Sequence, residues 1–202
     1  MVLKELLIAT NNPGKMLEIR SLLGRLKVKL LTPADLDLNL TIEEDGTTYV
    51  ENASRKAAAF THASGRISLA DDSGLEVAAL GGEPGLLSAR YAPMPHPADV
   101  DRRRYLLQRL EGKPLPWTAC FRATVAITTP AGEIHTFDGS CEGMIIPEER
   151  GENGFGYDPI FLVGGVEKTM AELSLEEKNH LSHRARAIHN ALPLLERIFK
   201  CE

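Results

Sequence analysis

Cysteines, long apolar runs and an excess of basic charge are all scarce or missing in this sequence. Its three cysteines, Cys120, Cys141 and Cys201, are odd in number and form no Cys-x-x-Cys pair. Neither a disulfide framework nor a zinc ribbon is therefore indicated, and we expect reduced, structural thiols. No apolar run approaches the ~20 residues that span a bilayer, and the stretch at residues 6–9 is too short for the core of a signal peptide. We expect a cytoplasmic protein without a membrane partner.

The charge balance is slightly acidic. The 202 residues include 23 Lys and Arg against 28 Asp and Glu, a formal net charge of -5. This argues against binding of nucleic acid through the overall field of the protein, although a local basic pocket remains compatible with it. The hydrophobic fraction of 43% is ordinary for a globular chain. We expect one domain over residues 1–202.

Strands and helices alternate in the first half of the sequence, and a hairpin follows. Asn12-Pro13 supplies an N-cap and a helix-starting proline, Thr48 and Glu51 have the spacing of a capping box, and Pro130-Ala131-Gly132 is a turn of hairpin length. We expect strands at residues 5–10, 28–31, 67–70, 75–80, 118–129 and 133–140. Helices are expected near residues 13–26, 48–64 and 99–110, and from Met170 onward with an interruption at Pro193. This order predicts a mixed α/β sheet with flanking helices.

The segment Thr10-Asn11-Asn12-Pro13-Gly14-Lys15 lies where the first predicted strand passes into the first predicted helix. Backbone N–H groups at a helix N-terminus attract anions, Gly14 permits close approach of a phosphate, and Lys15 adds a full positive charge. The spacing of a Walker A loop is absent. The segment therefore indicates a phosphate site, and the alternative is a tight turn in which Asn12 serves only as a cap.

Two acidic segments could hold a metal ion. They are Glu43-Glu44-Asp45 in a polar loop and Asp71-Asp72 at the end of a predicted strand. Mg²⁺ prefers oxygen ligands and usually takes one or two protein carboxylates, so one acid from each segment is enough. Adjacent like charges at the end of a buried strand also repel unless a cation is held there. The alternatives are a solvated acidic loop and an Asx-turn at Asp72-Ser73-Gly74.

The segment Phe155-Gly156-Tyr157-Asp158-Pro159 and the residues Lys178, His183 and Arg184 could recognise a nucleobase. An aromatic ring beside glycine offers a stacking face, and Arg and His donate to the O6 and N7 acceptors of a purine. The alternatives are a turn that feeds a strand at residues 160–162 and a solvated helix face.

Taken together, these segments resemble the inosine triphosphate pyrophosphatase family, and they do so in order over nearly the whole chain. The matching motifs are the Thr10 to Lys15 segment, Glu44-Asp45-Gly46, Glu51-Asn52-Ala53 with Lys56, Ala70-Asp71-Asp72-Ser73-Gly74-Leu75, Ser88-Ala89-Arg90-Tyr91, Gly154-Phe155-Gly156-Tyr157-Asp158-Pro159-Ile160-Phe161, and Lys178 with Ser182-His183-Arg184.

The resemblance implies an elongated mixed α/β fold with two lobes around a central cleft, a homodimer, and Mg²⁺-dependent hydrolysis of non-standard purine nucleoside triphosphates. ITP, dITP and XTP would yield the monophosphate and pyrophosphate, which keeps these bases out of DNA and RNA. Asp72 would be the catalytic base, and Glu44 and Asp72 would bind the metal. The implied substrate-binding residues are Thr10, Asn11, Asn12, Pro13, Gly14, Lys15, Lys56, Ser73, Phe155, Gly156, Tyr157, Asp158, Lys178, His183 and Arg184.

Other functions remain open at this point. An enzyme of this kind could prefer other triphosphates, such as modified pyrimidines. A nucleotide sensor would bind a phosphorylated ligand through Lys15 and Arg184 without chemistry, and the basic C-terminal segment gives a weak argument for nucleic acid binding. A zinc site at His180, His183 and His189 is disfavoured, because no acidic partner has suitable spacing. We expect a nucleotide substrate and no nucleic acid partner.

Overall fold

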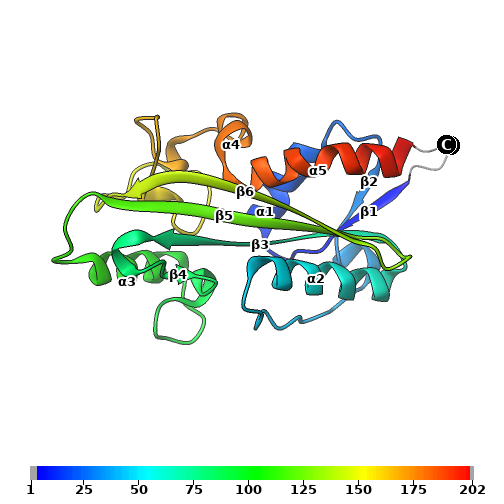
Figure 1. Ribbon diagram of the computed structural model, residues 1–202, viewed down its shortest axis with the longest axis horizontal. Coiled ribbons are helices and arrows are strands. Elements are labelled where there is room, and N and C mark those ends of the chain that lie inside the picture. The colour runs from blue at the N-terminus through cyan, green and yellow to red at the C-terminus, as the bar shows by residue number, and fades with distance from the viewer. Residues whose placement is uncertain (1–3, 201–202) are drawn as a thin grey trace. The chain divides into compact units, whose positions relative to one another are not determined.

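Three long strands, β3 (Ile67–Val77), β5 (Trp117–Thr128) and β6 (Ile134–Ile145), each contribute residues to two units of the chain (Figure 1). The computed structural model describes residues 4–200, so Cys201 lies outside the described residues. The first unit comprises the chain through Asp72, Ala123–Gly139 and the residues from Arg184 onward, and the second comprises Ser73–Arg122 and Ser140–His183. Each unit is thus assembled from segments that are distant in sequence.

The first unit contains a parallel set of strands joined by helices. β1 (Glu5–Ile8) pairs in parallel with β2 (Lys29–Leu31) and with β3, and Leu6 lies opposite both Leu30 and Ile67. The strand order is β2-β1-β3-β5-β6. Parallel neighbours require crossover connections, which here contain α1 (Pro13–Leu23) and α2 (Tyr49–Ser64). The predicted mixed α/β fold is confirmed.

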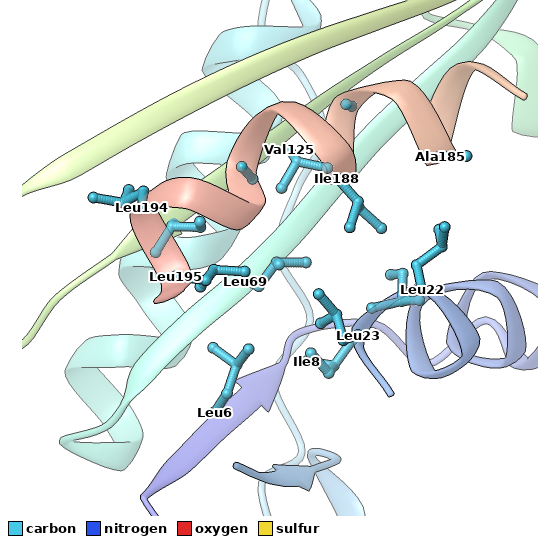
Figure 2. Packing of buried hydrophobic residues seen from close by; sticks show 14 of the residues in the cluster. Leu6, Ile8, Leu22, Leu23, Leu69, Val125, Ala185, Ile188, Leu194 and Leu195 are labelled. Atoms are coloured by element: carbon cyan, nitrogen blue, oxygen red, sulfur yellow. The ribbon is translucent and has the colours of Figure 1, made fainter. Parts of the chain in front are cut away.

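Alternate residues of these strands face different helices. Leu6 and Ile8 pack with residues of α1 and α5 (His183–Lys200), whereas Leu7 and Ala9 pack with residues of α2. Figure 2 shows Leu22 and Leu23 of α1 and Ile188, Leu194 and Leu195 of α5 gathered around the first of these faces. In Figure 1, α5 and α2 accordingly lie on opposite faces of β3. Burial of one such side chain contributes about 1.5–3 kcal/mol, so both faces stabilise the sheet.

The predicted helix ends are confirmed where they depend on local sequence. The Asn12 side chain accepts a hydrogen bond from the Lys15 N–H at 3.0 Å, and Pro13 is the first residue of α1. Thr48 caps α2 by accepting from the Glu51 N–H. The Glu51 carboxylate itself accepts from the Thr47 N–H at 2.6 Å, one residue before the cap.

Two predictions of local breaks are wrong. The Asp71-Asp72-Ser73-Gly74 segment neither ends a strand nor forms an Asx-turn, because β3 continues through it from Ile67 to Val77. Successive side chains of a strand point to opposite faces, so Asp71 and Asp72 have different partners. Asp71 pairs with Lys15 and Arg184, and Asp72 accepts a hydrogen bond from Asn52. These contacts remove the expected repulsion between the two carboxylates. Pro193 likewise does not interrupt the C-terminal helix, since α5 runs through it.

The second unit pairs short strands with the ends of the long ones. β4 (Pro84–Gly85) lies antiparallel to β3, and β7 (Phe161–Val163) lies antiparallel to β6. α3 (Asp99–Leu110) matches its predicted span and buries Leu106 and Leu110, while α4 (Leu175–Leu181) precedes α5. Short 3₁₀ helices occupy Ala34–Leu36, Ala78–Leu80, Ser88–Arg90, Asp158–Ile160 and Met170–Glu172.

The β5–β6 hairpin confirms the predicted turn, with the Thr129 N–H donating to the Glu133 carbonyl at 3.0 Å. Over the described part of the chain, no helix combines the length and apolar character needed to cross a membrane.

Candidate active site

The predicted phosphate segment lies between β1 and the N-terminus of α1, in the first unit. Residues Asn11, Asn12 and Pro13 are exposed, whereas Gly14 and Lys15 are half-buried. The Asn12 N–H donates to the Thr10 hydroxyl at 3.2 Å, which closes the turn. The first turn of α1 contains no acidic residue. The first turn of α1 therefore adds no negative charge of its own to the positive end of the helix dipole, a favourable arrangement for an anion.

Two lysines of the first unit neutralise its acidic residues. Lys15 Nζ lies 3.1 Å from Asp71 Oδ2, and Lys56 forms an ion pair with Glu44 and donates to the Asp71 carbonyl at 3.2 Å. Burial works to lower the pKa of Lys56, but the negative charges of Asp71 and Glu44 outweigh it and raise that pKa. Lys56 therefore remains charged at neutral pH.

Asp72 is a buried carboxylate held by Asn52 of α2. The Asn52 amide nitrogen donates to Asp72 Oδ2 at 2.9 Å, and its oxygen accepts from the Gly46 N–H at 2.8 Å. Burial raises the pKa of Asp72, and the nearby charge of Glu44 adds to the increase, against the opposing effect of the Asn52 hydrogen bond. Asn52 was part of a sequence motif without a predicted role. The structure makes it the link between the Glu44 loop and Asp72.

Arg184 does not lie on a solvated helix face, contrary to one sequence interpretation. Its side chain is 1% exposed, its Nε donates to Asp71 Oδ2 at 3.0 Å, and its Nη1 donates to Glu18. Burial raises the pKa of Asp71, but Lys15 and Arg184 outweigh this and hold that pKa well below its usual range. Two guanidinium nitrogens expected to serve a nucleobase thus bind carboxylates of the first unit. Glu18 was not identified as a site residue from the sequence, because nothing local links it to residue 184.

The predicted base-binding segment, residues 155–159, lies in the second unit, and Asp158 holds it in place through hydrogen bonds. Asp158 Oδ2 accepts from Lys178 Nζ at 2.6 Å and from the Phe155 N–H at 2.9 Å. Lys178 Nζ is also 5.2 Å from the centroid of the Phe155 ring, within range of a cation–π contact. The alternative interpretation as a turn feeding a strand is also correct, because β7 follows directly at Phe161. Lys178 is only 4% exposed, so it too does not lie on a solvated helix face.

Two further contacts hold aromatic residues that were predicted to bind the substrate, His183 and Tyr157, in the second unit. His183 is 4% exposed and stacks on Phe121, with ring centroids 4.7 Å apart. The Tyr157 hydroxyl donates to the Ser88 carbonyl at 3.0 Å, and burial raises the pKa of Tyr157. Ser73, predicted as a substrate-binding residue, follows Asp72 in β3 and belongs to the second unit. Among residues 4–200, no group of three or more His, Cys, Asp or Glu side chains could hold a metal ion.

Gly154 provides a direct test of the Asp158–Lys178 pair. Its φ is +76°, and an added Cβ would collide with the Asp158 carboxylate and approach Lys178 Nζ to 3.1 Å. We expect Gly154→Ala to cost about 3 kcal/mol or more, because it combines a left-handed alanine with disruption of a buried ion pair. Chemical denaturation of both proteins measures this difference.

Gly165→Ala is the matched control for Gly154→Ala. Gly165 has a φ of +75°, but an added methyl group meets no described atom within 4 Å. The free energy of unfolding of the control variant should fall by only about 1–2 kcal/mol, the cost of placing alanine in a left-handed conformation. Equal losses in the two variants would mean that the Asp158–Lys178 pair does not depend on Gly154.

The predicted site residues therefore form two groups, one in each unit. The first unit contains Thr10, Asn11, Asn12, Pro13, Gly14, Lys15, Glu44, Lys56, Asp72 and Arg184, and the second contains Ser73, Phe155, Gly156, Tyr157, Asp158, Lys178 and His183.

Comparisons with known proteins agree with the resemblance inferred from these motifs. The model of the Ham1 family matches residues 6–194. The chain is 45% identical over 196 residues to the dITP/XTP pyrophosphatase of Desulforamulus reducens, covering 96% of this chain and 97% of the relative. Identity to the dITP/XTP pyrophosphatase of Bacillus subtilis is 43% over 198 residues, covering 97% and 99%.

Solved structures give the same result. The Staphylococcus aureus Ham1 protein matches with a TM-score of 0.84 and 39% identity, covering 96% of this chain and 100% of that one. A HAM1 protein from Coxiella burnetii matches with a TM-score of 0.86 and 38% identity, covering 96% and 99%. Sequence motifs, fold and near-complete coverage thus agree, and the chain belongs to the Ham1 family.

Proposed function

We propose that this protein hydrolyses the non-standard purine triphosphates ITP, dITP and XTP to the nucleoside monophosphate and pyrophosphate, and so cleanses the nucleotide pool. The observation that supports this most strongly is the grouping in the first unit of Lys15 and Lys56 with a buried carboxylate, Asp72, whose pKa is raised. Relatives named dITP/XTP pyrophosphatase, 43–46% identical, also support it.

The polyphosphate end of the substrate is assigned to the first unit. The backbone N–H groups of Asn11 and Gly14 and the ammonium groups of Lys15 and Lys56 would bind phosphate oxygens. Preorganised donors of this kind stabilise the charge that develops on phosphate during hydrolysis. Lys56 forms an ion pair with Glu44, which is also a proposed metal ligand. When Glu44 binds the metal ion, the Lys56 ammonium would exchange this carboxylate for a phosphate oxygen.

The carboxylates of the first unit fit Mg²⁺. Glu44 and Asp72 would supply hard oxygen ligands from separate segments, and the charge of Glu44 lies near enough to Asp72 to raise the pKa of Asp72. Two protein carboxylates are the usual number for Mg²⁺, with water and substrate phosphates completing the octahedron. When bound, Mg²⁺ neutralises charge on the triphosphate.

Asp72 is the proposed general base. Its Oδ2 is engaged by Asn52, which fixes the orientation of the carboxylate. An oriented carboxylate with a raised pKa can accept a proton from the attacking water as the water adds to phosphorus. General base assistance of this kind contributes about 10²–10⁴-fold in rate.

The base end of the substrate is assigned to the second unit. The half-buried Phe155 ring offers a stacking surface, and its segment is held by Asp158, Lys178 and Tyr157. Discrimination for the 6-carbonyl of inosine and xanthine over the 6-amino group of adenine requires hydrogen-bond donors. Donation by His183 of this unit remains our prediction, and so does donation by Arg184 of the first unit, two of whose nitrogens bind Asp71 and Glu18. A buried mismatch with the base costs about 1–3 kcal/mol.

We further propose that residues 1–202 act as a single domain, as a cytoplasmic homodimer that needs no nucleic acid or membrane. The resemblance of the whole chain to one enzyme family supports these assignments.

Pyrophosphate release in a substrate panel tests the proposed activity. With Mg²⁺ present, ITP, dITP and XTP should each release pyrophosphate even when ATP or GTP is in excess. EDTA should abolish the reaction. Binding of ITP without turnover would instead favour a nucleotide sensor, and preferential turnover of modified pyrimidine triphosphates would change the substrate class.

A further inference from the structure

Both backbone groups of Gly156 are bound by side chains from the first two turns of α3. The Gly156 N–H donates to Asp99 Oδ2 at 2.6 Å, and the Gly156 carbonyl accepts from Arg103 Nη1 at 2.9 Å. Asp99 and Arg103 are four residues apart, so they lie on the same side of the helix. One acceptor and one donor on α3 therefore bind the N–H and carbonyl of a single residue that is more than fifty positions away in the sequence.

The two side chains are themselves held in place. Glu149 binds Arg103 through two parallel hydrogen bonds, Nε to Oε1 at 2.9 Å and Nη2 to Oε2 at 2.8 Å. Arg102 forms an ion pair with Asp99 and donates to the Ala89 and Pro97 carbonyls. The Arg103 side chain is only 12% exposed. A bidentate pair of this kind restricts the guanidinium plane, which leaves its third nitrogen directed at Gly156.

Hydrogen bonds to the backbone N–H and carbonyl restrict the conformation of a glycine more than that of any other residue. Gly156 has a φ of +61° and, as glycine, it has the widest range of backbone conformations of any residue. Its N–H belongs to the peptide group shared with Phe155, and its carbonyl belongs to the peptide group shared with Tyr157. Holding both peptide groups therefore fixes the direction in which the Phe155 and Tyr157 side chains leave the backbone.

We propose that Asp99 and Arg103 are positioning residues for nucleobase binding, which act by clamping Gly156 and thereby fixing Phe155. This inference rests on the proposed function, because it assumes that Phe155 stacks on the base of the substrate. The polyphosphate is assigned to the first unit, to which neither residue belongs. Their loss should therefore weaken binding of the base and leave binding of inorganic pyrophosphate unchanged.

Arg103→Met tests the donor side of the clamp. The wild-type protein and the variant are compared for the Kd of IMP, the inhibition constant of pyrophosphate, and KM and kcat for ITP. Loss of a charge-assisted bond to the segment should raise the Kd of IMP and the KM of ITP by about 10-fold. The inhibition constant of pyrophosphate should change less than twofold. Arg103→Lys, which retains a donor, should recover part of the lost IMP affinity.

Arg104→Met is the matched control, because it removes the same charge from the next residue of α3, where the side chain is exposed. It should leave all four constants at their wild-type values. Asp99→Ala removes the acceptor side of the clamp independently, and should repeat the selective loss of IMP affinity if Arg103→Met does not fold.

Three results would overturn the proposal: IMP affinity that is unchanged in both clamp variants, a parallel loss of IMP and pyrophosphate affinity, or an equal loss in Arg104→Met. Failure of the wild-type protein to hydrolyse ITP would instead contradict the proposed function, so the two failures are distinguishable.

Discussion

Asp72→Asn is expected to lower kcat for ITP by about 10²–10⁴-fold while the protein remains folded. The substituted amide retains the size of the carboxylate, and its oxygen can still accept the Asn52 hydrogen bond observed at 2.9 Å. The amide cannot accept the proton of the attacking water. Steady-state kinetics with saturating ITP measures the loss, and thermal unfolding of the variant shows that the fold is retained.

Asp45→Asn is the appropriate control for Asp72→Asn. Asp45 lies in the same acidic loop as Glu44, but its side chain is 65% exposed and pairs with Arg55. Neutralising it changes the net charge by the same amount, and an exposed ion pair is worth only about 0–1 kcal/mol. Turnover should stay within a few-fold of the wild-type rate. A wild-type rate for Asp72→Asn would remove Asp72 from the mechanism.

Arg184→Met is expected to destabilise the protein by about 3–5 kcal/mol, because Glu18 and Asp71 would be left as buried carboxylates without their shared cation. For a protein of this size, the loss corresponds to a decrease in Tm of about 6–20 °C. Thermal or urea unfolding measures it. Arg186→Met removes an exposed arginine from the same helix and should change stability by less than about 0.5 kcal/mol.

The effect of Arg184→Met should also depend on pH. In the wild-type protein the pKa of Asp71 is lowered, so its contribution to stability is present above the unfolded pKa near 3.8 and is lost as the pH falls. In the variant, loss of the guanidinium removes one of the positive charges that lower the pKa of Asp71, so protonation of Asp71 at lower pH relieves part of the penalty. The stability difference should be largest near neutral pH and should shrink toward pH 4. A difference that does not vary with pH would contradict the assignment of Arg184 as the cation for Glu18 and Asp71.

Local features of the fold could be predicted from the sequence, whereas the partners of buried charges could not. The cap at Asn12, the end of α2 at residue 64 and the turn at Gly132 all depend on neighbours within a few residues, and each is confirmed. The continuation of β3 through Asp71 and Asp72 depends instead on Lys15, Asn52 and Arg184, which reach it from other elements.

The same limit applies to the candidate site. Lys178 and Arg184 were expected at a nucleotide or on a solvated face, since charged residues are seldom buried. Their partners, Asp158 and Glu18, lie 20 and 166 positions away in the sequence, and only the folded chain brings each pair together. The identity of the motif residues could be predicted, but the atoms with which they pair could not.

Product identity in a single reaction tests the central claim most directly. Phosphorus NMR of ITP incubated with the wild-type protein and Mg²⁺ should show IMP and pyrophosphate in equal amounts, as expected if water attacks the α-phosphorus. Formation of IDP and orthophosphate would place the cleavage at the terminal phosphate and would contradict the proposed pyrophosphatase function.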